Sequence, residues 1–455
     1  MNISLDRVFV APRPLLARGS ARGEADGLTR DDAVLRVSRI ARGAAWPLAV
    51  LLVIHRVVIV AFNGNTTDDF TTVYSAVRRF IDGVPVYEQA YNHVDPLYLY
   101  NPGATLLLAP LGASGNLELM RAAFIVANAT AIIGALAVLT RLMGHRLGGA
   151  LFPVSIAAAF ATEAVTNTLA FANINGLLLL ALSVFLWALV RGLGESSPSQ
   201  PNRLDASPER LPGHKNTGLL WLAGIAIGLA IVVKPQFAPL LFLPLTRLEW
   251  RPIAAGLAIP LALNAIAWPM VPGAADYINK LVPYLGITRD YANASLPGMQ
   301  AYFGLPDAAF YPVWLACALC VAVGVIVLLR WRLTDVTVWA TTTSSLLLVG
   351  VFLLSSLGQQ YYSMWLFPTL FTAVLARSVF HSWPAWLAAA SFLMPVTWYS
   401  SHWPNAGRWL SVCMCTFGWL LLTVTITFTA LGWWVSQRHS RPRPEVDTSA
   451  SPDNL

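Results

Sequence analysis

Long apolar runs recur along most of the chain and are separated by short polar or basic connections. The runs are continuous rather than alternating, which favours helices over barrel strands, because backbone groups in lipid must be satisfied internally. We therefore predict an all-α, polytopic integral membrane protein with roughly 10–12 transmembrane helices, each of about 20 residues. The candidate crossings are 46–62, 118–141, 150–170, 176–192, 217–233, 236–246, 253–269, 312–329, 337–354, 364–380, 384–400 and 409–434.

Several segments depart from a simple crossing. Residues 63–101 form a polar loop, and within it 71–82 has the apolar spacing of an amphipathic helix that lies along the membrane surface. Segment 104–113 is too short to span a core about 30 Å thick, so we interpret it as re-entrant. The apolar pattern is also interrupted at 173–176 and at Lys234-Pro235. Broken helices at membrane depth commonly line a cavity.

Arginine residues concentrate in alternate connections, which indicates the orientation in the membrane. With these connections inside, both termini are cytoplasmic, and loops 63–101 and 270–311 face outward. If 104–113 did cross the bilayer, the middle of this map would invert. The sequence further predicts flexible tails at 1–44 and 437–455 around a transmembrane domain, 45–436.

Composition excludes several functions. The chain is 56% hydrophobic and 12% charged, and its net charge of +7 comes mainly from arginines in tails and short connections, so we expect a lipid bilayer rather than nucleic acid as partner. It contains no Walker motif, no dinucleotide-binding glycine pattern and no Gly-x-Ser-x-Gly elbow. ATP-driven transport is therefore unsupported.

An acidic pair, Asp68-Asp69, opens the outer loop directly after the first crossing. Charge next to lipid is costly and tends to mark function. A carboxylate there can act as a base toward an acceptor hydroxyl, and we assign this role to Asp69 with Asp68 beside it. Either residue could instead cap the helix at 71–82. A divalent ion held by both and Asp95 is a less favoured alternative, so no cofactor is expected.

The same loop is rich in aromatic residues. His93 and Asp95 stand beside Tyr98 and Tyr100, a combination that suits sugar rings and lipid head groups. An interfacial aromatic belt is the alternative for each tyrosine.

Two basic residues are candidates for binding phosphate. Lys234 follows an apolar run and precedes a helix-breaking proline, whereas Arg289 belongs to the outward loop 270–311. Lys234 could instead reach the nearest head group, and Arg289 could pair with Asp290.

Polar residues elsewhere complete the candidate site. Glu163 shares a helical face with Thr166 and Asn167, and together with Asn173 and Asn175 they predict a polar wall or a seam between helices. An outward turn, which can close over a sugar, contains Gln359, Gln360 and Tyr361. A transporter that uses Arg56 and Glu163 for coupling is a rival hypothesis.

Five motifs occur in one order along the chain: Asp69-Phe70-x-x-Val73-Tyr74-x-Ala76, Gly83-x-x-x-Tyr87, Tyr98-x-Tyr100-Asn101-Pro102, Asn173-x-Asn175-Gly176 and Lys234-Pro235. In this order they resemble the GT-C membrane glycosyltransferases that use polyprenyl-phosphate sugars. Further strings resemble most the branch of actinobacterial arabinofuranosyltransferases, which introduce α-1,3 branches into cell-wall arabinan. These strings are Asn63-Gly64-Asn65-x-Thr67-Asp68-Asp69-Phe70, Val94-Asp95-Pro96-x-Tyr98-Leu99-Tyr100, Thr162-Glu163-x-Val165-Thr166-Asn167-Thr168-Leu169, Thr288-Arg289-Asp290-Tyr291 and Tyr302-Phe303-Gly304-Leu305-Pro306.

This resemblance implies a decaprenyl-phosphate arabinofuranose donor, an arabinan acceptor and an inverting transfer. It implies Asp69 as the base, with Lys234 and Arg289 toward the donor phosphate. In the related mannosyltransferase branch a histidine stands where this chain has Gln359-Gln360. The resemblance therefore assigns no second polar catalytic contact at this turn. A mannosyltransferase that uses polyprenyl-phosphate mannose and a phospholipid acceptor is the alternative within the same fold.

Overall fold

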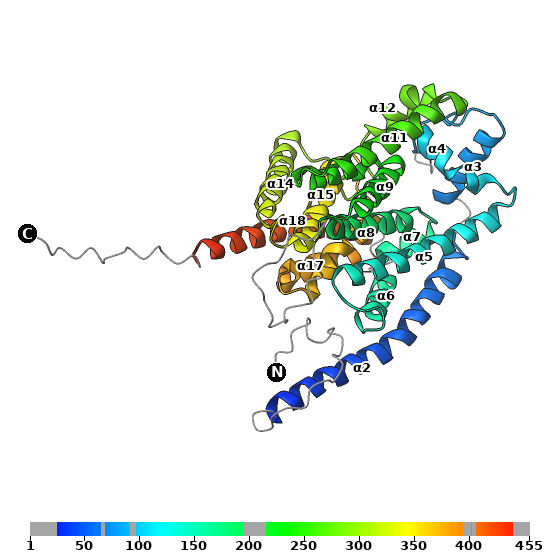
Figure 1. Ribbon diagram of the computed structural model, residues 1–455. Coiled ribbons are helices and arrows are strands. Elements are labelled where there is room, and N and C mark those ends of the chain that lie inside the picture. The colour runs from blue at the N-terminus through cyan, green and yellow to red at the C-terminus, as the bar shows by residue number, and fades with distance from the viewer. Residues whose placement is uncertain are drawn as a thin grey trace, which may run out of the picture.

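The computed structural model describes residues 25–64, 69–91, 97–194, 215–394, 402 and 406–439, and these contain helices but no strand (Figure 1). Among them, seven helical spans are long and apolar enough to cross a membrane. The prediction of an all-α, polytopic membrane protein is confirmed. The spans are formed by α2 (Ala25–Ile54) with η1 (His55–Ala61), α5 (Leu117–Leu142), α8 (Asn175–Gly192), α11 (Trp250–Met270), α14 (Asp307–Leu328) with η5 (Leu329–Trp331), α15 (Val336–Leu354) and α18 (Ala406–His439).

Four further apolar helical segments are shorter. Segment 104–113 is one of them, as its length predicted. The four are α4 (Pro102–Leu108) with η2 (Ala109–Gly112), α6 (Leu151–Ala161), α9 (Thr217–Val233) and α17 (Trp383–Leu393). At the N-terminal side, α2 begins at Ala25 and so extends into the segment expected as a tail.

Three predicted crossings are not continuous helices. The crossing at 150–170 breaks at Thr162, whose backbone is extended and whose hydroxyl accepts a hydrogen bond from the Val165 N–H, so that a new helix begins. The segments expected as crossings at 236–246 and 364–380 consist of short helical pieces, most of which follow one another directly. In the crossing at 150–170 the new helix is α7 (Glu163–Ala170). The segment at 236–246 contains η3 (Pro235–Leu241) and α10 (Phe242–Thr246). The segment at 364–380 contains η6 (Gln360–Leu366), α16 (Phe367–Leu370), η7 (Phe371–Val374) and η8 (Val379–His381).

Helix α9 packs against both α8 and α11 (Figure 1). Its glycines permit the close approach of α11. A Cβ added at Gly224 would lie 2.7 Å from the Cβ of Ala255, and one added at Gly228 would lie 3.0 Å from the Ala255 carbonyl oxygen. Small residues at helix contacts are the usual means by which membrane helices pack closely.

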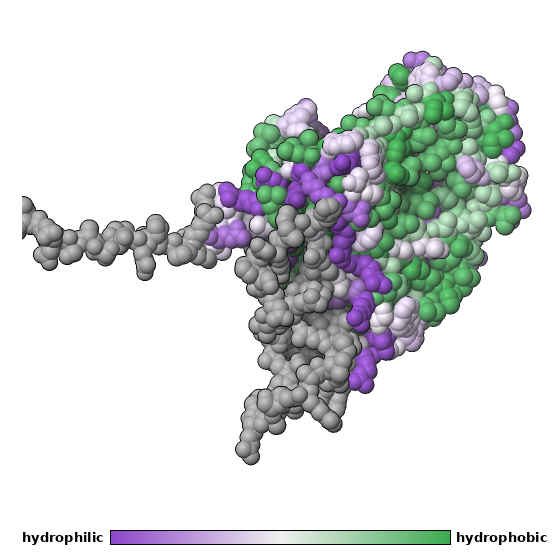
Figure 2. Space-filling view, in the orientation of Figure 1, coloured by the Kyte–Doolittle hydropathy of each residue, from purple (hydrophilic) through white to green (hydrophobic). Residues whose placement is uncertain are grey.

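The surface agrees with a membrane location. Figure 2 shows a broad apolar face with hydrophilic residues along its margins. Large apolar side chains are exposed on α9 and α11, among them Ile225, Leu257 and Leu261. Side chains of this kind favour contact with lipid over water.

The polar loops gather at one end of the bundle, where α3 (Asp69–Ile81) lies near α4 and α12 (Val282–Leu285) (Figure 1). The predicted amphipathic helix is confirmed as α3, which buries Phe70, Val73 and Val77. Asn101 fixes α4 beside the end of α9, because its Oδ1 accepts from the Ala104 N–H and its Nδ2 donates to the Val232 carbonyl at 2.7 Å. The remaining outer elements are η4 (Tyr277–Leu281) and α13 (Leu296–Phe303).

Candidate active site

Asp69 is the first residue of α3, and it is held by the loop between α7 and α8. Its backbone N–H donates to the Phe171 carbonyl at 3.2 Å. Its carboxylate Oδ2 accepts from the Asn173 Nδ2 at 2.5 Å. Asp69 is partly buried, and its side chain points toward this loop. The carboxylate is thereby fixed against a segment distant in sequence.

Lys234 is placed by the end of α9. The helix stops at Val233, and Lys234 takes an extended conformation with φ −136° and ψ 102°, because Pro235 disfavours the helical conformation of the residue before it. Its Nζ donates to the Asn175 Oδ1 at 3.0 Å. The ammonium lies 4.4 Å from the ring centroid of Tyr362 and 5.1 Å from that of Trp365, which are cation–π distances.

Hydrogen bonds of Asn173 and Asn175, at the start of α8, link the Asp69 carboxylate to the Lys234 ammonium. The Oδ1 of Asn173 accepts from the Asn175 N–H at 3.2 Å, so that the residue bound to Asp69 also holds the residue bound to Lys234. Asn175 is fully buried, and its Nδ2 has no partner among the described residues. A buried amide N–H without a partner is available to a ligand oxygen.

Two tyrosines of η6, together with Tyr100, face the same site. Burial raises the pKa of Tyr100 above its ordinary value, and the Asp69 carboxylate raises it further. Burial and then Asp69 act in the same direction on the pKa of Tyr361, which the Arg289 guanidinium lowers in part. Burial raises the pKa of Tyr362 as well, and Arg289 opposes this shift. The charge of Asp69 therefore acts on all three tyrosine hydroxyls, and the charge of Arg289 acts on those of Tyr361 and Tyr362.

The other predicted site residues have different surroundings. The Tyr98 hydroxyl lies 2.7 Å from the Thr105 hydroxyl, and its ring packs against Tyr87 and Tyr100 in a buried aromatic cluster of the loop. Gln359 accepts a hydrogen bond from the Tyr361 hydroxyl, and Gln360 begins η6 with its side chain partly exposed. Three predicted residues, Asp68, His93 and Asp95, lie outside the described residues.

Comparison with known proteins identifies the family. The model of glycosyltransferase family 87 matches residues 98–357. The chain therefore belongs to glycosyltransferase family 87.

Relatives match nearly the whole chain. An "Alpha-(1->3)-arabinofuranosyltransferase" of Corynebacterium glutamicum is 47% identical over 417 residues, which cover 92% of this chain and 94% of that protein. Proteins of the same name from Mycolicibacterium smegmatis and Mycobacterium tuberculosis are 41% and 40% identical, and each comparison covers 85% of the relative. No solved structure matches the chain.

Sequence reasoning missed part of this candidate site. Asn173 was expected in a polar wall but not as a partner of Asp69, and Tyr362 and Trp365 were not singled out as partners of Lys234. The spacing of Tyr361, Tyr362 and Trp365 on one turn was the available signal, since neighbours at three and four residues share a helical face. The spacing alone does not reveal that these rings contact the Lys234 ammonium.

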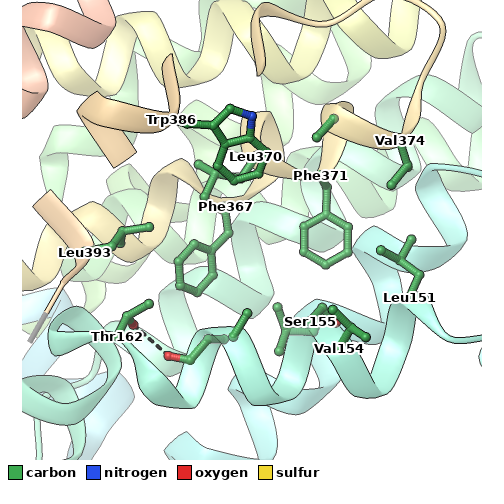
Figure 3. A pocket seen from close by; sticks show the side chains of 14 residues that line it. Leu151, Val154, Ser155, Thr162, Phe367, Leu370, Phe371, Val374, Trp386 and Leu393 are labelled. Atoms are coloured by element: carbon green, nitrogen blue, oxygen red, sulfur yellow. Dashed lines mark hydrogen bonds between the residues drawn. The ribbon is translucent and has the colours of Figure 1, made fainter. Parts of the chain in front are cut away.

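An apolar cavity lies apart from this polar cluster. It has a volume of about 290 Å³ and is enclosed by α6, α16, η7 and α17 (Figure 3). Phe367, Phe371 and Trp386 face Leu151 and Val154 across it. Because apolar side chains dominate the lining, we assign it no chemical step.

Metal ligands do not gather in the described part of the chain, where no three His, Cys, Asp or Glu side chains lie together. The alternative of a divalent ion on Asp68, Asp69 and Asp95 involves two residues outside that part, so it stays a prediction.

Proposed function

We propose that this glycosyltransferase moves arabinofuranose from decaprenyl-phosphate arabinofuranose to cell-wall arabinan and forms α-1,3 branches. The observation that carries the proposal is the turn of Asn173 and Asn175, which joins the Asp69 carboxylate to the Lys234 ammonium. The names and the 40–47% identity of the relatives support the sugar and the linkage. Such branches belong to arabinogalactan and lipoarabinomannan.

The reaction is a single inverting displacement. The acceptor hydroxyl oxygen attacks the anomeric carbon and forms the new glycosidic bond while the bond from that carbon to the phosphate oxygen breaks. The hydroxyl proton passes to the Asp69 carboxylate, and the polyprenyl phosphate leaves with the bonding electrons. A positioned base of this kind typically contributes a factor of about 10²–10⁴ in rate.

Basic and amide groups receive the leaving phosphate. Lys234 supplies an ammonium, Arg289 a guanidinium and Asn175 an unpartnered amide N–H, so that negative charge is stabilised where it develops. Tyr100 and Tyr361 line the sugar position, together with Gln359. A phosphate leaving group needs little protonation, so one carboxylate suffices.

The site works at the outer face of the plasma membrane in this proposal. Arginine-rich connections mark the opposite side, where both termini lie, by the positive-inside tendency. The polyprenyl donor then enters from the bilayer, while the arabinan acceptor comes from outside.

The test is transfer from synthetic polyprenyl-phosphate arabinofuranose to a short α-1,5 arabinan by purified protein, with linkage analysis of the product. A new 3-linked branch is expected from wild type. The variant Asp69→Asn should lose at least about a hundred-fold in rate, because the amide cannot accept the proton.

A matched control lies directly after the same helix. Asp82 pairs with Arg78 at 3.1 Å at the far end of α3, so Asp82→Asn should transfer like wild type. Rapid turnover by Asp69→Asn would refute the assigned base. Transfer from a mannose donor but not from the arabinofuranose donor would refute the proposed sugar and would be compatible with the same fold.

A further inference from the structure

Asn173 donates a short side-chain hydrogen bond to the proposed base. It is 4% exposed, and its Nδ2 lies 2.5 Å from the Asp69 Oδ2. The residue before it, Ala172, has φ 46°, a left-handed conformation that a non-glycine residue rarely adopts. Strain of this kind persists only where the surroundings enforce it, and here it directs Asn173 toward Asp69.

The hydrogen bonds determine which way the Asn173 amide points. Its Oδ1 lies 3.2 Å from the backbone nitrogen of Asn175, and a backbone N–H can only donate. The oxygen must therefore face Asn175, and the NH₂ group must face Asp69. Asn173 thus presents a fixed N–H donor to the Asp69 carboxylate. Its amide group cannot be rotated by 180° without loss of both hydrogen bonds.

Several charged or titratable groups surround that carboxylate. Lys234 faces it from the end of α9, Tyr100 from the loop before α4, and Tyr361 and Tyr362 from η6. Unlike these groups, the Asn173 amide is neutral and does not change its charge with pH. Its donated hydrogen bond favours the ionised form of the carboxylate, and the donor itself does not titrate.

We propose that Asn173 is a positioning residue that fixes the orientation of the Asp69 carboxylate and keeps it ionised for proton abstraction. This inference rests on the proposed function, since it concerns how the proposed base is held. Asn173 touches neither the reacting atoms nor the leaving group in this scheme. Its effect is transmitted through Asp69.

The test is the pH dependence of kcat/KM for arabinofuranosyl transfer. Asn173→Ala removes the donor, so the acidic fall in rate should move to higher pH by about one unit. Asn173→Asp keeps an oxygen for the Asn175 N–H but places a second carboxylate against Asp69. The acidic fall should then move further upward than in Asn173→Ala, because a neighbouring like charge disfavours ionisation.

A control separates positioning from folding. Asn128 is equally buried, and its Oδ1 accepts from the Gly176 and Leu177 N–H groups at the same end of α8, without a described contact to Asp69. Asn128→Ala should lower the thermal stability. The pH at which kcat/KM falls on the acidic side should stay the same as in wild type.

Three outcomes would contradict these claims. If the Asn173 variants keep the wild-type acidic fall while Asp69→Asn is inactive, the positioning role is wrong and the proposed base survives. If Asp69→Asn turns over normally, the proposed base itself is wrong. An acidic shift in Asn128→Ala equal to that of Asn173→Ala would show that the effect is structural.

Discussion

At the residue scale, Lys234 illustrates how burial and partners set the chemistry of one side chain. Burial lowers the pKa of its ammonium below the ordinary lysine value, and the Asp69 carboxylate opposes this shift. The aromatic rings of Tyr362 and Trp365 stabilise the cation without neutralising it. A lysine so placed stays receptive to a phosphate, because no carboxylate is bonded directly to it in the described contacts.

This environment predicts an alkaline fall in activity. A lowered pKa means that the ammonium is charged at low pH and loses its proton before the ordinary lysine value of about 10.4. The donor affinity that depends on this charge should disappear over the same range. In Lys234→Arg the guanidinium stays charged, so the alkaline fall of kcat/KM should move upward even if the overall rate drops.

Lys280 provides the comparison for this measurement. It is paired with Asp276 at 2.8 Å and is 47% exposed on the outer loop. Lys280→Arg should retain the wild-type alkaline fall. An unchanged alkaline fall in Lys234→Arg would instead assign that titration to another group.

At the element scale, the junction between α7 and α8 decides where the site residues stand. The α8 N-terminus is pressed against α5, where the Asn128 side chain accepts from its first N–H groups. A Cβ added at Gly176 would lie 2.7 Å from the Asn128 carbonyl oxygen and 2.8 Å from its Oδ1. Only glycine permits this approach, and Asn175 directly precedes it.

Gly176→Ala should therefore push α8 away from α5. We expect a loss of about 1–3 kcal/mol in the free energy of unfolding, as for other overpacked sites, and a fall in transfer rate as Asn175 shifts. The measurement is thermal unfolding in detergent together with initial rates.

Gly134→Ala is the matched control on the same helix pair. Its added Cβ would meet only the Leu180 Cδ1, at 3.6 Å, an ordinary contact. Replacing a helical glycine by alanine without a clash is neutral or stabilising by about 0.5–1 kcal/mol. Equal melting temperatures for the two variants would contradict the steric argument.

At the scale of the whole molecule, the proposed orientation places the polar loops and the site on one side of the bilayer. Two exposed positions report on opposite sides: Leu305 is 42% exposed after α13, and Leu333 is 64% exposed after η5. The native thiols lie within the apolar helices α14 and α18, where Cys317 and Cys415 are buried and Cys320 and Cys413 are partly buried.

A membrane-impermeant maleimide should accordingly label Leu305→Cys in intact cells. Leu333→Cys should be labelled only after permeabilisation, and the wild-type chain should give little signal. The reverse pattern would place the site on the cytoplasmic side and would overturn the outer-face proposal.

The sequence by itself determined the helical membrane class, the amphipathic helix α3 and the prominence of Asp69 and Lys234. These follow from local periodicity and from the high cost of placing charge in an apolar chain, both of which are visible without a structure. Tertiary structure alone decided the break at Thr162, the partnership of Asn173 with Asp69, and the aromatic rings around Lys234. Hydrogen bonds and ring contacts between distant residues depend on how helices pack, and helix packing leaves no fixed spacing in the sequence.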